Sequence, residues 1–276
     1  MSLFTLTLIF GAVISHAAWN LVVKSAADRL GALAIVSLAI GVVGLIIVAF
    51  TPIPRDPMVW ALIGLSALVH YGYHIFLLLS YRYADFSLAY PIARGSVPLL
   101  VLVLAMWTQS EVPEPLAILG ICLVALCIFL LSFGTQRLAP IGFVLALVTG
   151  FWIAGYTILD GIGVRTAQPA MAYIGWLFVT HLALPIAVWG FVWRGRVPAG
   201  LTRLVPFGFL APLAYGLVLF AKIEADLAAV SALRETSVLL AAVLGVFWLG
   251  EGRGQARVRI FAACVVMVGA ALVALA

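Results

Sequence analysis

The chain has 276 residues, of which 66% are hydrophobic and 9% are charged, and its mean hydropathy is +1.25. Soluble domains carry about 25% charged residues, so this composition excludes an ordinary soluble domain and predicts an all-α integral membrane protein. The formal net charge is +5. The basic residues lie in short segments between apolar runs, so they indicate membrane topology, and we expect no nucleic-acid partner.

Ten apolar runs follow one another along the chain, each close to the roughly 20 residues that a membrane-spanning helix needs. The predicted spans are 3–24, 30–50, 58–81, 87–109, 115–133, 140–160, 170–193, 204–221, 227–249 and 258–276. They leave only short connections, so we expect no extramembrane domain. The first run has neither a basic start nor a small-residue cleavage site and is predicted to be a retained span.

The span predicted for 3–24 carries a polar stripe. His16, Asn20 and Lys24 are spaced i, i+4, i+8 on one helical face, and Trp19 lies beside Asn20. We expect His16, Trp19 and Asn20 to line a central cavity. Lys24, near the end of the span, is expected to extend toward the membrane surface.

The span predicted for 58–81 contains two histidines with tyrosines between them. His70 and His74 are spaced i, i+4, with Tyr71 and Tyr73 interleaved. This spacing can bind a metal, but the segment lacks the glutamate of the zinc-protease motif. We therefore favour a cavity wall that includes His70, Tyr73 and His74 over a zinc site.

The spans predicted for 87–109 and 227–249 hold charges inside apolar helices. Arg94 lies between Pro91 and Pro98, and Arg234 is followed directly by Glu235. The arginines are predicted to bind a substrate carboxylate or phosphate. A buried carboxylate can exchange a proton near neutral pH, so Glu235 is predicted to couple transport to protons. The structural alternative is an ion pair between Glu235 and Arg94.

Aromatic residues complete the predicted cavity. Trp152, Tyr156 and Asp160 are spaced i, i+4, i+8, which matches the stripe of the first span at a shift of 136 residues. The faces of Tyr90, Trp152, Tyr156 and Tyr215 could hold an ammonium group by cation–π attraction, or could simply pack. The predicted substrate-binding set also includes Ser231.

The second half of the chain repeats features of the first. Arg94 precedes Glu111 by 17 residues, and Arg234 precedes Glu251 by the same interval, 140 residues later. An arginine at the bilayer centre costs about 2.5–3.5 kcal/mol, so two at matching places indicate a duplicated bundle with a polar centre. Because five helices are an odd number, the second copy must enter the membrane from the opposite side. We therefore predict ten transmembrane helices in two inverted five-helix repeats, 1–135 and 136–276.

The loops give a bias in charge. One side of the predicted membrane holds ten basic residues: Lys24, Arg29, Arg82, Arg137, Arg194, Arg196, Arg203, Arg253, Arg257 and Arg259. The other side holds Arg55, Arg165 and Lys222. Taken alone, this bias places both termini outside the cytoplasm.

Three passages resemble the drug/metabolite transporter superfamily, in its EamA-like group: His16–Lys24, Ser87–Arg94 and the pair Gly250-Glu251. The resemblance covers the whole chain as two five-helix units, with Ser110 standing where the second copy has Gly250. It implies a carrier of amino acids, sugars, nucleotide sugars, choline-like cations or drugs. It also implies cytoplasmic termini, contrary to the charge bias, so the orientation stays open.

The chain contains no ATP-binding loop, nucleophile elbow or dinucleotide fingerprint. We therefore expect no cofactor and no enzyme activity. We predict a secondary active transporter, preferably an exporter, of a small polar metabolite such as an amino acid, driven by protons or by exchange. The alternatives are transport of a quaternary amine or drug-like cation, a lipid-carrier translocator, and an intramembrane enzyme. We expect a monomer or weak homodimer among the lipids of a plasma membrane, such as a bacterial inner membrane, with a zwitterionic small molecule as substrate.

Overall fold

The computed structural model describes residues 1–276 except 25, 27, 85, 131–138, 197–199 and 250–255, and leaves out the side chains of 21–24, 29, 86–88, 130, 241–249 and 256–260. Every regular element in this described part is helical. Seven of its helical segments are long and apolar enough to cross a membrane. The prediction of an all-α chain is therefore confirmed for the described residues, and the seven segments are compatible with a membrane protein, whereas the count of ten spans stays a prediction.

The helices of the first half begin and end within a few residues of the predicted spans. They are α1 (Leu3–Lys24), α2 (Arg29–Phe50), α3 (Pro57–Tyr83), α4 (Phe86–Gln109) and α5 (Pro115–Leu130). Two of them start at aspartate caps: Asp28 accepts from the Gly31 amide and Asp56 from the Met58 amide, both at 2.8 Å. Such a cap satisfies an amide that the helix itself leaves unpaired.

The second half contains α6 (Pro140–Thr166), α7 (Ala170–Thr180), α8 (Ala183–Ala187), a π-helix (Val188–Val192), a 3₁₀ helix (Leu201–Leu204), α9 (Val205–Gly208), α10 (Leu210–Glu224), α11 (Leu227–Leu249) and α12 (Ala256–Leu275). The helices predicted for 170–193 and 204–221 are thus interrupted. Pro185 cannot donate to the carbonyl of His181, and Pro212 cannot donate to that of Gly208, so the α-helix breaks near both carbonyls.

α6 continues six residues beyond its predicted end at 160. Gly161 and Gly163 lie within this helix and do not end it. They are needed there because neighbouring side chains approach their backbone closely. A Cβ at Gly161 would lie 2.5 Å from Leu227, and one at Gly163 would lie 2.2 Å from the Tyr173 ring. Asp160 is therefore well inside a helix, which the sequence did not predict.

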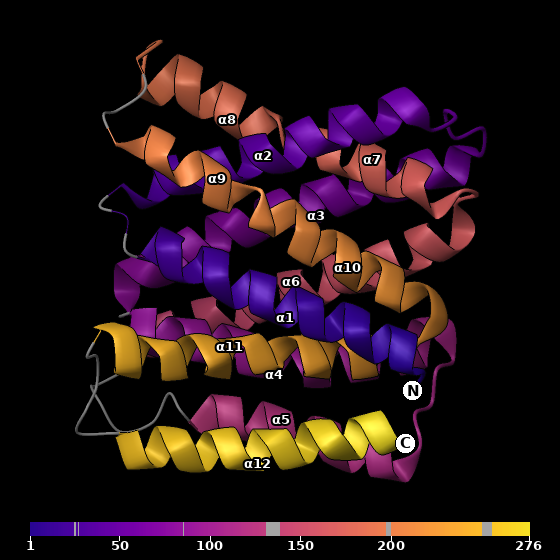
Figure 1. Cartoon of the computed structure of the whole chain (residues 1–276), viewed down its shortest axis with the longest axis vertical. Helices are drawn as coiled ribbons and strands as arrows, with labels where there is room; N and C mark the ends of the chain where they lie inside the picture. The colour runs from indigo at the N-terminus through magenta and orange to yellow at the C-terminus, as the bar shows by residue number, and fades with distance from the viewer. Residues whose placement is uncertain (25, 27, 85, 131–138, 197–199, 250–255) are drawn as a thin grey trace.

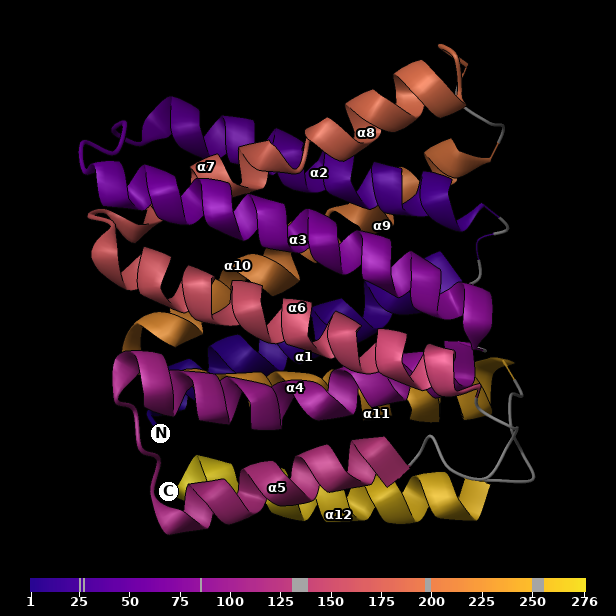
Figure 2. The ribbon, with the colours of Figure 1, turned by 180° about the vertical axis from the view of Figure 1, so that it is seen from behind.

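Figures 1 and 2 show the helices stacked side by side, with α5 and α12 together at one edge and α2, α7 and α8 at the opposite edge. Between these edges, α3 packs on α6 and α1 packs on α10. The two ends of the chain meet, because the amino group of Met1 donates to the carbonyl of Ala274 at 3.2 Å. Most of the buried polar and charged residues lie on the helices between these two edges.

Large apolar side chains remain exposed on the outside of the bundle. Phe50 is 87% exposed, Phe191 85% and Trp107 82%. Lipid contact would cover such a surface, whereas water would make it unfavourable. The outer surface therefore agrees with membrane insertion.

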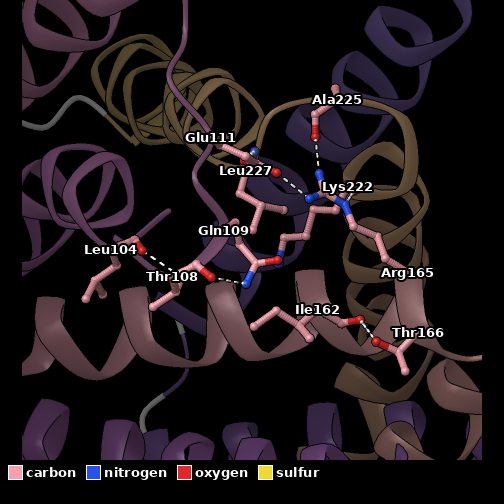
Figure 3. A network of polar contacts seen from close by, with 10 residues as sticks. All are labelled: Leu104, Thr108, Gln109, Glu111, Ile162, Arg165, Thr166, Lys222, Ala225 and Leu227. Carbon is pink, nitrogen blue, oxygen red and sulfur yellow. Dashed lines mark hydrogen bonds and ion pairs between the residues drawn. The ribbon is translucent and has the colours of Figure 1, made fainter. Parts of the chain in front are cut away.

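A polar network joins the ends of α4, α6, α10 and α11 (Figure 3). Glu111 pairs with Arg165 and also accepts from the Leu227 amide at 2.9 Å. Arg165 donates to the carbonyls of Lys222 at 2.7 Å and Ala225 at 2.8 Å. Glu111 thus holds helix ends together. Its predicted counterpart Glu251 lies outside the described residues.

Two basic residues of the predicted charge count lie in helices and not in loops. Arg165 belongs to α6, and Lys222 is fully buried in the last turns of α10, so neither is an ordinary loop charge. Of the basic residues counted on the opposite side, several side chains lie outside the described residues: Lys24, Arg29, Arg137, Arg253, Arg257 and Arg259.

Replacing Arg165 by glutamine should lower the free energy of unfolding by about 1.5–3 kcal/mol, because charged hydrogen bonds to Glu111 and to backbone carbonyls are lost. The measurement is thermal unfolding of the detergent-solubilised protein. Arg55→Gln, which changes an exposed loop arginine, is the control. Equal melting temperatures for the two variants would contradict a holding role for Arg165.

Candidate functional site

A cavity of about 370 Å³ lies inside the bundle. Its lining comes from α1, α2, α3, α4, α6, α10 and α11, and from His181 at the end of α7. Many residues predicted for substrate binding line it: His16, Trp19, Asn20, His70, Tyr73, His74, Tyr90, Arg94, Tyr156, Tyr215 and Arg234. The described part of α5 and α12 contributes no lining residue, whereas α2 and His181 were not foreseen as walls.

The cavity occupies one half of the bundle along the helix axes. On α3 it extends from His70 near the middle to Tyr81 near the end, and on α2 it is lined from Leu33 to Ile40. It therefore reaches toward the end of the bundle at which α1 connects to α2. The Glu111–Arg165 network joins helix ends at the opposite end.

A buried charge centre lies at the cavity wall. Glu235 is fully buried, and Arg94 and Arg234 are 4% and 5% exposed. Arg94 Nε lies 2.7 Å from Glu235 Oε2, and Arg234 Nη2 donates to Glu235 Oε1 at 3.2 Å. Each carboxylate oxygen thus faces a different guanidinium. The centre carries two positive charges and one negative charge.

This centre retains unused hydrogen-bonding capacity. The Arg94 Nε–H is not aligned for a hydrogen bond to Glu235 despite the short distance. Arg234 Nε and Trp19 Nε1 are buried without a hydrogen-bond partner among the described residues. Arg94 Nη2 lies 3.3 Å from His16 Nε2. Buried donors of this kind are normally satisfied, so the arrangement is suited to an anionic or polar ligand.

Three predicted site residues do not line the cavity. Trp152 stacks on Phe76, with ring centroids 5.8 Å apart, and its ring lies close to Gly72. Ser231 is 1% exposed behind the wall, and Glu235 is covered by its two arginines. For Trp152, the helical face predicted to be polar is turned toward α3 by this packing.

A second polar centre, which the sequence interpretation missed, surrounds Asp160. This residue is fully buried, yet its carboxylate accepts three hydroxyl hydrogen bonds. Ser66 donates at 2.5 Å and Tyr173 at 2.9 Å, both to Oδ1, and Tyr215 donates to Oδ2. The predicted span ends at residue 160, so nothing in the sequence indicates that this aspartate lies well inside a helix.

His70 links this centre to the cavity. Its Nε2 lies 3.2 Å from the Tyr215 hydroxyl, and its Nδ1 lies 2.9 Å from the Ser66 carbonyl and 3.2 Å from the Ser66 hydroxyl. Both ring nitrogens therefore face protein atoms. Metal binding would require His70 to give up one of these contacts, which argues against the zinc alternative.

Lys222 is the second buried charge that the sequence did not reveal. Its ammonium group donates to the carbonyl of Thr157 at 3.1 Å, one helical turn before Asp160 on α6. Only the position of this lysine at the predicted end of a span could have signalled burial. It brings a positive charge close to the Asp160 centre.

Comparison with known proteins supports the fold alone. No protein-family model matches the chain, and no curated protein matches it. A solved structure described only as "Crystal structure of protein" is similar over 98% of both chains, with a TM-score of 0.75 and 17% sequence identity. At this identity the likeness concerns the arrangement of the helices and carries no function.

Water access to the cavity can be tested with cysteine substitutions. Ser37 lines the cavity, while the next residue, Leu38, is 40% exposed on the outside. In a variant whose three native cysteines are replaced by alanine, Ser37→Cys should react with a charged methanethiosulfonate. Leu38→Cys should not, because a thiolate does not form in lipid. Equal labelling rates for the two variants would contradict a water-filled cavity at Ser37.

Proposed function

We propose that the protein is a secondary active transporter of a small polar metabolite that carries a carboxylate, such as an amino acid. The observation that carries this proposal is the Arg94–Glu235–Arg234 centre at the wall of a cavity within apolar helices. Its surplus positive charge favours an anionic group. A buried arginine pair at such a place is expensive unless a ligand or a partner uses it.

The remaining walls suit an ammonium group as well. Tyr73, Tyr90 and Tyr156 line the same cavity, and aromatic faces attract cations. Arg94 already lies over the Tyr90 ring, 5.8 Å from its centroid. A zwitterion would use both the arginines and the tyrosines. The same tyrosines favour a quaternary amine as the second candidate substrate.

The packing of the helices supports an inverted repeat with domains 1–135 and 136–276. In such a repeat, α1 corresponds to α6, α2 to α7, α3 to α10, α4 to α11 and α5 to α12. A contact between α3 and α6 in this arrangement then requires one between α10 and α1, and a contact between α4 and α5 requires one between α11 and α12. All four of these contacts occur, as do the contacts that map onto themselves, α2–α7, α4–α11 and α5–α12. Transporters with such repeats alternate access around a central site. This agrees with the resemblance to EamA-like drug/metabolite transporters.

The one-sided cavity suggests how access alternates. In this state the cavity lies in the half near the α1–α2 connection, and the Glu111–Arg165 network ties the opposite helix ends. If the Glu111–Arg165 network broke while the helices closed over the cavity, the Arg94–Glu235–Arg234 centre would become accessible from the opposite side of the membrane. The chain would do this in a plasma membrane without ATP or a cofactor, driven by an ion gradient or by exchange.

Arg94→Gln should weaken binding of a carboxylate ligand by about 10- to 100-fold, because a charged hydrogen bond is worth about 1.5–3 kcal/mol. Glu235→Gln should have the opposite effect, because the surplus charge rises from one to two. Both effects can be measured as thermal shifts of the purified protein with a panel of amino acids, organic acids and choline, since bound ligand raises the stability of the folded state.

Three outcomes would overturn parts of this proposal. If Arg94→Gln binds the same acids as tightly as the unmodified protein, the arginine is structural and the substrate site is elsewhere. If choline alone stabilises the protein, the quaternary-amine alternative holds. If nothing in the panel stabilises it, the carboxylate proposal fails.

A further inference from the structure

The hydrogen-bonded ring around Asp160 contains one proton fewer than its contacts require. The ring is formed by Asp160, Ser66, His70 and Tyr215, which contact one another in that order and return to Asp160. Tyr215 has a single hydroxyl proton but lies against two acceptors, Asp160 Oδ2 and His70 Nε2. It can donate to only one of them at a time.

Counting donors shows where a proton is missing. The 2.9 Å contact of His70 Nδ1 with the Ser66 carbonyl is a hydrogen bond only when Nδ1 carries the ring hydrogen, since a carbonyl can only accept. Nε2 of a neutral His70 then has a lone pair that faces Tyr215. If Tyr215 donates to Asp160, two lone pairs meet at His70, and if it donates to His70, two lone pairs meet at Asp160.

One added proton resolves either case. Placed on His70 Nε2, it is donated to the Tyr215 oxygen while Tyr215 donates to Asp160. Placed on Asp160 Oδ2, it is donated to Tyr215 while Tyr215 donates to His70. Buried polar networks are stable only when every contact is satisfied, so the ring favours binding a proton.

We propose that the ring of Asp160, Tyr215, His70 and Ser66 binds one exchangeable proton and is the coupling site of this transporter. This inference rests on the proposed function and assigns the coupling proton to the ring, in place of Glu235. Glu235 contacts two guanidinium groups, which do not give up a proton, whereas Asp160 belongs to a ring with an imidazole that can hold one. Changing the charge of a group coupled to the cavity can link proton and substrate binding.

The proton has a route and a set of charged neighbours. His70 and Tyr215 line the cavity, whereas Asp160 and Ser66 lie behind them, so a proton from cavity water reaches the carboxylate through the ring. The titratable and charged groups that face the ring from the helices around it include His74 on α3, Tyr156 on α6, Tyr173 on α7, His181 directly after α7, Lys222 on α10 and Arg234 on α11.

The test is infrared difference spectroscopy of the purified full chain in phosphatidylethanolamine–phosphatidylglycerol vesicles, recorded between alkaline and acidic pH without any substrate. The unmodified protein should show one titration step with a protonated-carboxyl or imidazolium signal that is absent from both Asp160→Asn and His70→Gln. Both variants should lose the titration step, because the side-chain amide of asparagine or glutamine supplies the hydrogen that the unmodified ring lacks. Glu235→Gln should retain it, as should the exposed control Asp56→Asn, which keeps a residue that caps helices.

Tyr215→Phe keeps the shape of the ring but removes the shared hydroxyl, so it should shift the midpoint of the step. If circular dichroism shows that Asp160→Asn does not fold, Tyr215→Phe and His70→Gln together provide the test. Loss of the step in Glu235→Gln alone, or spectra of Asp160→Asn and His70→Gln that match the unmodified protein, would overturn the proposal. Loss in only one of these two ring variants would also overturn it, because the proton would not be shared.

The failure of the transport proposal is distinguishable from this failure. If the ring titrates as described but Arg94→Gln leaves carboxylate binding intact, the proton site stands and the proposed substrate site falls. If Arg94→Gln weakens binding while no ring variant changes the spectrum, the substrate site stands and the coupling assignment falls.

Discussion

The pairing of one buried carboxylate with two buried arginines is the constraint on which the rest of the arrangement depends. Three ionised side chains inside an apolar bundle are stable only if they face one another and not lipid. Glu235 satisfies this requirement by offering one oxygen to each arginine. α4 and α11 must therefore pack side by side, which brings the cavity walls to the centre of the bundle.

A second buried centre, around Asp160, lies behind the part of the cavity wall that His70 and Tyr215 form. The two centres differ in what surrounds their carboxylates: Glu235 pairs with two guanidinium groups, whereas Asp160 accepts from three hydroxyls and has the ammonium group of Lys222 nearby. Guanidinium groups do not lose their protons in proteins, whereas a ring of hydroxyls and an imidazole can gain or release one. This difference separates a site suited to substrate charge from one suited to proton exchange.

The sequence predicted much of this bundle because hydrophobic runs and intramembrane polar residues are strong signals. Arg94, Arg234, His16 and His70 stood out as polar residues inside apolar runs, and each lines the cavity. Helix ends were less predictable where glycine serves packing rather than termination. The predicted span ended at Asp160, whereas α6 continues to Thr166, so this aspartate was expected at a helix end.

Two other differences also come from tertiary packing. Lys222 looked like a loop residue because a charge at the end of an apolar run usually marks the membrane surface, yet α10 continues to Glu224 and buries it. Trp152 had the spacing of a cavity residue but stacks on Phe76, because Gly72 leaves room for its ring. Helical spacing identifies a shared face, but it does not say which neighbour that face meets.

The most direct test of the central claim is an experimental structure of the protein with a stabilising carboxylate ligand bound. We predict that the ligand carboxylate lies within hydrogen-bond distance of Arg94 or Arg234, and that at least one of these arginines has moved relative to Glu235. A ligand bound elsewhere, with both contacts to Glu235 unchanged and no ligand atom near either guanidinium, would show that the two arginines do not form the substrate site.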